Sequence, residues 1–401
     1  MSDLEAFRRE VEDFISERAP KFLLGKRKDS LAETQGGKRW RFHYPESKQW
    51  LDLMAEKGWT APTWPKEYGG AGLSPQHARV IRDVISKLQL PPPLTGQNFG
   101  LYMIGPTILK LGTEEQKRTH LTAIARGEIR WCQGYSEPNA GSDLAAVQTS
   151  AVLDGDDYVL NGQKVWTSYG DQADWMFLIA RTDPAAKKQQ GITFFLLDLS
   201  TPGVELLPIK LISGASPFCE TFYDNCRVPA ANILGELNHG WTVAKTLLEH
   251  ERTMISGSSG EAMGGIAVSP MQLMEEYLAR DENGRVKDTL LRDRIIQGSM
   301  DGLCYILTTL RARDEAKAGQ SPGPLSSMFK IYGTELNQRL EELDLAIRGP
   351  QALGWEGEGF TDEEIRGTRS WLRSRGNTIE GGTSEIQRNI IAKRVLGLPD
   401  E

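Results

Sequence analysis

The sequence has few cysteines and histidines, and none stands in a spacing typical of a disulfide framework or a metal site. The four cysteines are far apart and form no Cys-x-x-Cys motif, so we expect reduced thiols and a cytoplasmic location. The five histidines include no His-Glu-x-x-His motif, and we expect no metal. The first residues also lack the pattern of a signal peptide.

An excess of basic charge and long apolar runs are missing as well. The 401 residues carry a formal net charge of −7, which gives no basic field to attract nucleic acid. No apolar run reaches the roughly 18 residues that a membrane span needs. A hydrophobic content of 39% suits two or three domains with a large core. We therefore expect neither a nucleic acid nor a membrane as partner.

The hydrophobic pattern changes twice along the chain. Apolar residues recur at helical spacing through the first third. Residues 97–111 are apolar on nearly all faces, which predicts a buried helix, and Thr113 is the expected cap of the next helix. From Gln148 the period becomes two, and Asp154-Gly155 and Asn161-Gly162 are dipeptides typical of hairpin turns. Helical spacing returns from Gly240, and further helices are expected over residues 272–280, 288–318, 325–347 and about 384–396. This order predicts an α+β chain with an N-terminal α-helical domain, a middle antiparallel β-barrel or sandwich, and a C-terminal helical bundle. We place the three domains at residues 1–128, 129–238 and 239–401.

A polar segment, Tyr135 to Asp143, lies where the helical pattern gives way to strands. Pro138 and Gly141 break regular structure, which predicts a loop. Ser136, Ser142 and the backbone N–H groups around Gly141 are donors that suit a polar, anionic ligand. An ordinary turn has a similar composition, so this segment alone leaves both interpretations open.

Trp166 and Ser168 stand two residues apart on a predicted strand. Their side chains are therefore expected on the same side of the strand. An indole beside a hydroxyl suits a flat heteroaromatic ring, which would gain stacking and one hydrogen bond. A core tryptophan beside an unrelated serine is the alternative.

Three segments together resemble one family. They are Tyr135–Asp143 (YSEPNAGSD), Asn161–Ser168 (NGQKVWTS) and Gly382–Arg388 (GTSEIQR). In their order and domains the chain resembles the acyl-CoA dehydrogenases along nearly its whole length. The resemblance implies a C-terminal four-helix bundle, FAD between the barrel and that bundle, and an acyl-CoA substrate. It also implies oxidation of the substrate in lipid β-oxidation, with electrons passed to an electron-transfer flavoprotein.

The resemblance further implies which residues bind the cofactor. Toward the flavin it implies Gln133, Tyr135, Ser136, Trp166 and Ser168, with Trp166 against the isoalloxazine ring and Ser168 near N5. Gly141 and Ser142 would belong to the same site, with Ser142 toward the pyrophosphate or the CoA. In the C-terminal domain it implies Thr383 and Glu385 on the adenosine side, and Arg280, Gln351 and Gly354 toward the FAD of a neighbouring subunit.

Desaturation requires a base for the α-proton of the thioester, and a buried carboxylate is suited to this role. Family members carry it either just before the Gly-Thr of the last motif or before an arginine in the first long C-terminal helix. Gly381 fills the first position and Glu251, followed by Arg252, fills the second. We therefore expect Glu251 to be the base and Arg252 to bind CoA. Glu380 as the base, and Glu251 as a solvated helix residue, remain open.

Some residues depart from the family pattern. Tyr135 replaces a small aliphatic residue, and the segment 280–284 lacks the phenylalanine that reaches a neighbouring subunit's FAD. A homotetramer and a heterotetramer with a related subunit are both consistent with this. An FAD-poor structural subunit, an oxygen-reactive acyl-CoA oxidase and a flavin monooxygenase of the same fold are alternative functions. Four glycines suggest room for a bulky acyl group or close helix packing: Gly257, Gly260, Gly264 and Gly265.

Overall fold

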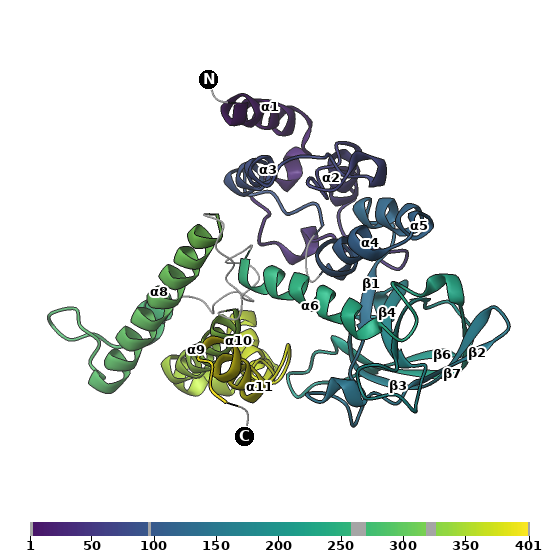
Figure 1. The fold of residues 1–401 in the computed structure, drawn as a ribbon. Coiled ribbons are helices and arrows are strands. Elements are labelled where there is room, and N and C mark those ends of the chain that lie inside the picture. The colour runs from purple at the N-terminus through teal and green to yellow at the C-terminus, as the bar shows by residue number, and fades with distance from the viewer. Residues whose placement is uncertain (1–2, 95–97, 258–269, 318–325, 400–401) are drawn as a thin grey trace. The chain divides into compact units, whose positions relative to one another are not determined.

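The computed structural model describes residues 3–94, 98–257, 270–317 and 326–399 (Figure 1). Of the side chains in these ranges, those at 249–257, 313, 316–317 and 326 lie outside the description. Contacts divide the chain into two compact units. The first contains Met1–Ile209 and Pro217–Glu251, and the second contains Lys210–Ser216 and Arg252–Glu401.

The first unit begins with helices, as the hydrophobic spacing predicts. They are α1 (Asp3–Arg18), α2 (Pro45–Glu56), α3 (Pro75–Lys87), α4 (Gly105–Leu111) and α5 (Glu114–Ala125). Ser74 accepts a hydrogen bond from the backbone N–H of His77 at the start of α3. Thr113 and Gln116 form a capping box at the start of α5, which confirms Thr113 as the predicted cap. Apolar faces of α1, α2 and α3 share one buried core.

The segment 97–111, expected to be one buried helix, is less regular. A π-helical turn spans Gly100–Ile104 and α4 follows directly. Pro106 has no N–H to donate to the carbonyl of Tyr102, so the α-helical pattern cannot run through this point. Tyr102 is 45% exposed, and the prediction of burial on nearly all faces is wrong for this residue.

A curled seven-stranded sheet follows, in the order β1-β4-β2-β3-β7-β6 with β5 paired to β4. The strands are β1 (Trp131–Gly134), β2 (Ser150–Asp154), β3 (Asp157–Ser168), β4 (Trp175–Arg181), β5 (Ile192–Asp198), β6 (Val204–Ile209) and β7 (Phe218–Pro229). Most pairs are antiparallel, as predicted, but β1 and β2 each pair with β4 in parallel. Helix α5 packs on this edge, because the buried ring of His120 meets the rings of Trp131 and Trp175 edge-on.

The two dipeptides predicted to form hairpin turns differ in structure: one forms a turn and the other lies within a strand. Asp154-Gly155 joins β2 to β3 and confirms the predicted hairpin. Asn161-Gly162 lies inside β3, at an irregularity of its pairing with β7, so the second predicted turn is wrong. A Cβ at Gly162 would lie 2.7 Å from the Cα of Thr149. Glycine is present there because two strands approach closely, rather than because the chain reverses.

The second unit is helical. It contains the end of α6 (Gly240–Gly257), then α7 (Pro270–Tyr277), α8 (Thr289–Lys317), α9 (Ser326–Arg348), α10 (Asp362–Ser374) and α11 (Ser384–Ile390). Helix α10 was not among the predicted elements. Apolar residues of α7, α8 and α9 form the core of the second unit. Within the described ranges, every helix is too short or too polar to cross a lipid bilayer.

Candidate functional site

Strand β1 leads directly into the polar loop and fixes its first residues. Gln133 is paired with Phe177 of β4. A Cβ at Gly134 would lie 2.5 Å from the sulfur of Met176, so this position favours glycine. The ring of Tyr135 is buried against Phe177, with centroids 5.9 Å apart. Its neighbour Ser136 accepts a backbone hydrogen bond of 2.9 Å from Val165 of β3.

A buried ion pair lies beneath this loop. The Lys164 ammonium donates to the Glu137 carboxylate at 2.8 Å and to the carbonyl of Tyr135 at 3.0 Å. Glu137 also accepts from the backbone N–H groups of Gln148 and Thr149. Burial lowers the pKa of Lys164 to about 8, although Glu137 opposes the shift. Burial alone would raise the pKa of Glu137, but Lys164 and the N–H donors outweigh it and lower that pKa.

No role is predicted for Glu137 or Lys164 from the sequence, although they belong to the segments Tyr135–Asp143 and Asn161–Ser168. One signal was available. Period-two alternation places Lys164 in phase with Tyr158 and Leu160, which are buried. A lysine in the buried phase of a strand predicts an acidic partner, because an unpaired buried charge is very costly.

The loop turns tightly beyond Glu137. Glu137 and Ala140 exchange two backbone hydrogen bonds of 3.0 Å, and this turn brings Gly141 and Ser142 to the surface, where both are exposed. A Cβ at Gly141 would meet nothing within 4 Å. Open space around these two residues is compatible with a ligand that approaches the backbone.

Trp166 lies at a bulge near the end of β3. The pairing of β3 with β7 shifts between Lys164 and Thr167, and Trp166 has a left-handed φ of 62°. In a regular strand Trp166 would share the buried side of Lys164, but the bulge leaves its side chain 54% exposed. Thr167 is buried and Ser168 is partly exposed, so Trp166 and Ser168 both flank an inward-facing residue. A large exposed indole beside a hydroxyl fits a flat, polar ring system.

In the second unit, Thr383 and Glu385 lie at the start of α11. Thr383 accepts from the N–H of Ile386 as the N-cap, and Glu385 is exposed with Arg388 at 3.4 Å. Both border a surface pocket of about 460 Å³ formed by α9, α11 and the segment between α10 and α11. The Ser384 hydroxyl, which also borders it, is buried and has no hydrogen-bond partner among the residues that the structure describes. The polar lining and this unsatisfied hydroxyl fit the hydroxyl-rich part of a dinucleotide.

The three residues expected to reach a neighbouring subunit occupy two places in the second unit. Arg280 follows α7 and donates to the carbonyl of Gly284 at 2.7 Å. Gln351 and Gly354 lie just after α9, where Gln351 is exposed and Gly354 is buried. A Cβ at Gly354 would meet the ring of Phe360 at 2.5 Å. Packing within the chain therefore accounts for this glycine.

The candidate bases differ in what can be described. Glu251 lies in α6, and its side chain and that of Arg252 are outside the described residues. Gly260, Gly264 and Gly265 lie outside the described ranges. The backbone of Gly257 is described as part of α6, but its surroundings are not. Glu380 is exposed, and its two carboxylate oxygens accept from Arg373 and Asn377, each at 2.7 Å.

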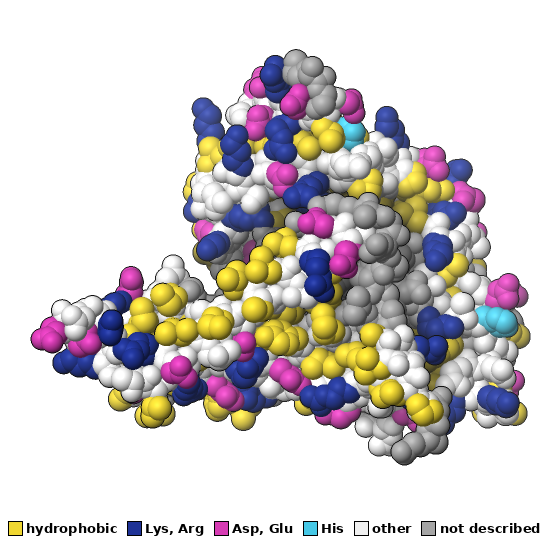
Figure 2. Space-filling model, turned by 60° about the vertical axis from the view of Figure 1, so that its left-hand side comes forward, with side chains coloured by type: hydrophobic (Ala, Val, Ile, Leu, Met, Phe, Trp, Pro, Cys, Tyr) yellow, Lys and Arg dark blue, Asp and Glu magenta, His cyan; other side chains and the backbone are white. Residues whose placement is uncertain are grey.

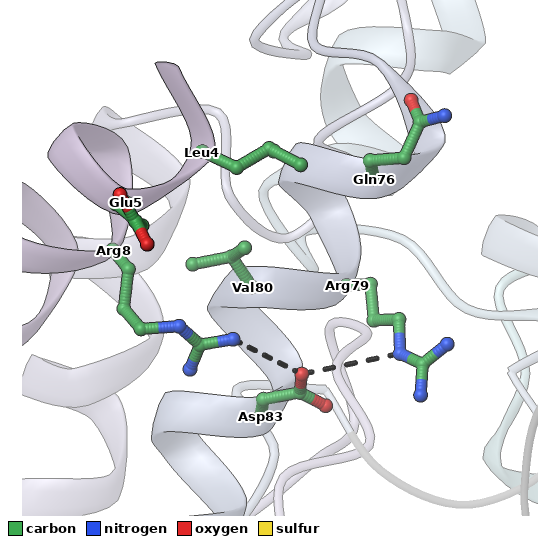
Figure 3. Close-up of a pocket in the computed structure, with 7 residues that line it drawn as sticks. All are labelled: Leu4, Glu5, Arg8, Gln76, Arg79, Val80 and Asp83. Carbon is green, nitrogen blue, oxygen red and sulfur yellow. Dashed lines mark hydrogen bonds and ion pairs between the residues drawn. The ribbon is translucent and has the colours of Figure 1, made fainter. Parts of the chain in front are cut away.

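A further pocket, of about 360 Å³, lies between α1 and α3 (Figure 3). Asp83 there contacts Arg8 at 3.4 Å and Arg79 at 3.9 Å. These side chains are 40–50% exposed, and exposed ion pairs of this kind contribute little. Of the expected site residues whose side chains are described, none borders this pocket.

Comparison with known proteins agrees with these features. Family models for the acyl-CoA dehydrogenase N-terminal, middle and C-terminal domains match residues 1–128, 132–226 and 238–396. Acyl-CoA dehydrogenase IpdE1 of Mycobacterium tuberculosis is 34% identical over 402 residues, which cover 100% of this chain and 99% of that protein.

Solved structures give the same result. The structure described as the Tcur3481-Tcur3483 steroid ACAD is 29% identical, with a TM-score of 0.76 over 99% of this chain and 98% of that one. The ChsE4-ChsE5 complex from Mycobacterium tuberculosis is 30% identical, with a TM-score of 0.75 over 100% and 99%. The chain belongs to the acyl-CoA dehydrogenase family of flavoprotein oxidoreductases.

Proposed function

We propose that this chain is an FAD-dependent enzyme that converts an acyl-CoA thioester to its trans-2-enoyl-CoA. The observation that carries the proposal is the exposed indole of Trp166, which the bulge in β3 presents beside Ser168. Exposing so large an apolar ring in water is unfavourable, and a bound isoalloxazine ring would cover it. FAD, when bound, supplies the acceptor for the β-hydride.

The remaining expected residues would hold the cofactor as follows. Gln133, Tyr135 and Ser136 would contact the flavin pyrimidine, and Ser168 would donate near N5. In the second unit, Thr383 and Glu385 would bind the adenosine side, which the polar pocket beside α11 supports. Gly141 and Ser142 would lie toward the pyrophosphate or CoA. Three residues are proposed to serve a neighbouring subunit's FAD: Arg280, Gln351 and Gly354.

We assign the removal of the α-proton to Glu251 and the contact with CoA to Arg252. Two observations on the competing position support this. Gly381, which fills the other family position for the base, has a left-handed φ of 63° that disfavours glutamate. Glu380, one residue earlier, already binds Arg373 and Asn377 with both oxygens. Donors to the thioester carbonyl would stabilise the enolate that forms as the proton leaves.

Matched variants test this assignment. Glu251→Gln should bind FAD normally but show no bleaching of the flavin when an acyl-CoA is added without oxygen. Glu380→Gln, the matched control, should bleach as the unchanged protein does. Bleaching retained in Glu251→Gln and lost in Glu380→Gln would move the base to Glu380.

Activity assays can identify the electron acceptor and the substrate. We propose that an electron-transfer flavoprotein reoxidises the enzyme, so little peroxide should form in air; rapid peroxide release would identify an oxidase instead.

We propose that the substrate has a bulky acyl group, such as a steroid CoA ester, because one similar structure is described as a steroid ACAD. A purified protein without bound flavin that takes up no added FAD would favour the structural-subunit alternative.

We also propose that the chain assembles with a second subunit of the same fold, either a copy or a relative. Figure 2 shows exposed apolar side chains in yellow. Helix α8 carries a row of exposed apolar residues at intervals of three and four: Ile296, Met300, Leu303, Leu307 and Leu310. This spacing is that of a helix-packing seam, and burying it would be strongly favourable. The similar ChsE4-ChsE5 structure is described as a complex of two named chains, which supports a related subunit as partner.

A further inference from the structure

The two segments proposed to contact the flavin meet at a single buried ammonium group. Lys164 stands two residues before Trp166 on β3, and its Nζ is 3.0 Å from the carbonyl oxygen of Tyr135. The same Nζ is 2.8 Å from Glu137 Oε1. The backbone N–H of Val165 adds a hydrogen bond of 2.9 Å to the carbonyl of Ser136. Lys164 and Val165 thus link the loop after β1 to the bulge of β3.

The carboxylate of Glu137 extends this connection to the far end of the loop. Its Oε2 accepts from Gln148 N at 2.7 Å, and its Oε1 accepts from Thr149 N at 2.9 Å. Nearby, Arg181 donates to the carbonyl of Ala145 at 2.7 Å. The loop from Tyr135 to Thr149 is therefore held by two charged side chains of the sheet, Lys164 and Arg181, and its end is tied to its own residue Glu137.

This arrangement is more than stability requires. Lys164 is fully buried and Glu137 is 8% exposed, so both ions lose most of their hydration. Replacing a buried ion pair by apolar or neutral groups of similar volume is often neutral or stabilising. What such a replacement loses is the directed hydrogen bond from Nζ to the Tyr135 carbonyl, which fixes the position of that backbone.

We propose that Glu137 and Lys164 are positioning residues, which hold the Tyr135–Ser136 backbone against the Trp166 bulge before the cofactor binds. This inference rests on the proposed FAD-binding role of those segments. A loop fixed in advance loses less conformational freedom when FAD binds, and so binds it more tightly.

The double substitution Glu137→Gln with Lys164→Met removes both charges and keeps side chains of similar length. No unpaired charge remains, but one backbone N–H that donated to Glu137 and the carbonyl of Tyr135 lose their partners, so its thermal midpoint should fall by at most about 8 °C. Its apoprotein should bind FAD about tenfold more weakly, since the loop is no longer preorganised. The visible circular dichroism of the bound flavin should also change, which a purely structural role would not cause.

Tyr223→Phe is the matched control. It removes another buried polar contact of the same sheet, the 2.9 Å approach of the Tyr223 hydroxyl to the sulfur of Met176. FAD affinity and flavin circular dichroism should be unchanged in this variant. If the double variant also keeps both properties unchanged, the positioning role is wrong. If the unchanged protein itself binds no FAD, the proposed function fails instead.

Hydrogen exchange of the unchanged apoprotein tests the inference without any variant. The amides of Gln148, Thr149 and Val165 donate to Glu137 and Ser136. Peptides containing these amides should be protected from exchange before FAD is added, and FAD should add little protection. Protection that develops only with FAD would overturn the proposal, because the loop would then be ordered by the cofactor.

Discussion

The indole of Trp166 meets the phenyl ring of Phe218 edge-on, with ring centroids 5.8 Å apart and planes at 90°. Phe218 begins β7 and is paired with Ser168. The ring therefore supports the exposed indole from the neighbouring strand. Phe218→Ala should leave the sheet folded but free the indole to rotate. Because an edge-to-face contact contributes about 0.5–1.5 kcal/mol, we expect FAD to bind roughly two- to tenfold more weakly. Unchanged affinity in a fluorescence titration would show that Phe218 does not orient Trp166.

The left-handed backbone of Trp166 separates its role in folding from its role in binding. A non-glycine residue in this conformation costs about 1–2 kcal/mol. Both variants lose the indole's contact with Phe218, but only glycine relieves the backbone strain. Trp166→Gly should therefore not lower the free energy of unfolding, whereas the β-branched Trp166→Val should lower it by about 1 kcal/mol. Both variants should bind FAD weakly, because both lack the indole. Urea unfolding of the apoproteins, with FAD titration beside it, measures the two effects. A Gly variant that unfolds as easily as the Val variant would contradict this.

Gly162 should tolerate no side chain. Its φ is 149°, and a Cβ would come within 2.7 Å of the Cα of Thr149 and 2.7 Å of its hydroxyl oxygen. Because backbone must move to make room, Gly162→Ala should destabilise the protein by about 2–4 kcal/mol. Gly141→Ala is the control, since a Cβ there meets nothing within 4 Å. Thermal midpoints of the two variants should differ clearly, and equal midpoints would argue against a close strand approach at Gly162.

Glu341 predicts a pH dependence of stability. Burial, and then the charge of Asp344, raise its pKa to about 7 from an ordinary 4.5. Between these two values the unfolded chain loses this proton before the folded chain does. The contribution of Glu341 to the free energy of unfolding therefore falls as the pH rises through this window, by up to about 3 kcal/mol in total, and stays low above it.

The substitution Glu341→Gln should remove this penalty. We expect a higher thermal midpoint than that of the unchanged protein at pH 8, and a much smaller gain at pH 5. Glu342→Gln, at the exposed neighbouring residue that pairs with Arg375 at 2.8 Å, should show no such trend. A gain from Glu341→Gln that is the same at both pH values would exclude the raised pKa.

The apolar row on α8 predicts an effect on assembly. Leu303 and Leu307 are 56% and 55% exposed, so Leu303→Glu with Leu307→Glu should not disturb the chain's own fold. It should reduce the mass of the particle in light scattering, because charges would be buried in the interface. Leu153→Glu, which changes a residue 58% exposed on β2, serves as control. An unchanged mass in the α8 variant would place the interface elsewhere.

The sequence carried the order of helices and strands, because hydrophobic period and capping residues are local signals. The cap at Thr113 and the hairpin turn at Asp154-Gly155 could be predicted for this reason. Asn161-Gly162 was misread because the same dipeptide serves a turn or a close approach of strands, and only the fold decides between them. The bulge at Trp166 could not be predicted, since it depends on the register between β3 and β7. Helix α10 was missed although Thr361 and Glu364 form a capping box at its start.

The candidate site was predictable only in part, for a similar reason. The motif residues were identified by resemblance, but the link from Lys164 to Glu137 and Tyr135 joins positions 27 and 29 residues apart. Its only local signal is a lysine in the buried phase of a strand. The burial of Tyr135 against Phe177 and Phe194 likewise depends on β4 and β5.

Anaerobic titration of the FAD-loaded protein with a panel of CoA esters, from short linear chains to bulky steroid-like ones, tests the central claim most directly. We expect at least one ester, with a bulky acyl group, to bleach the flavin absorbance and to yield one equivalent of the 2-enoyl-CoA. A protein that binds FAD but is bleached by no ester, or is bleached without forming the enoyl product, would contradict the proposed dehydrogenation.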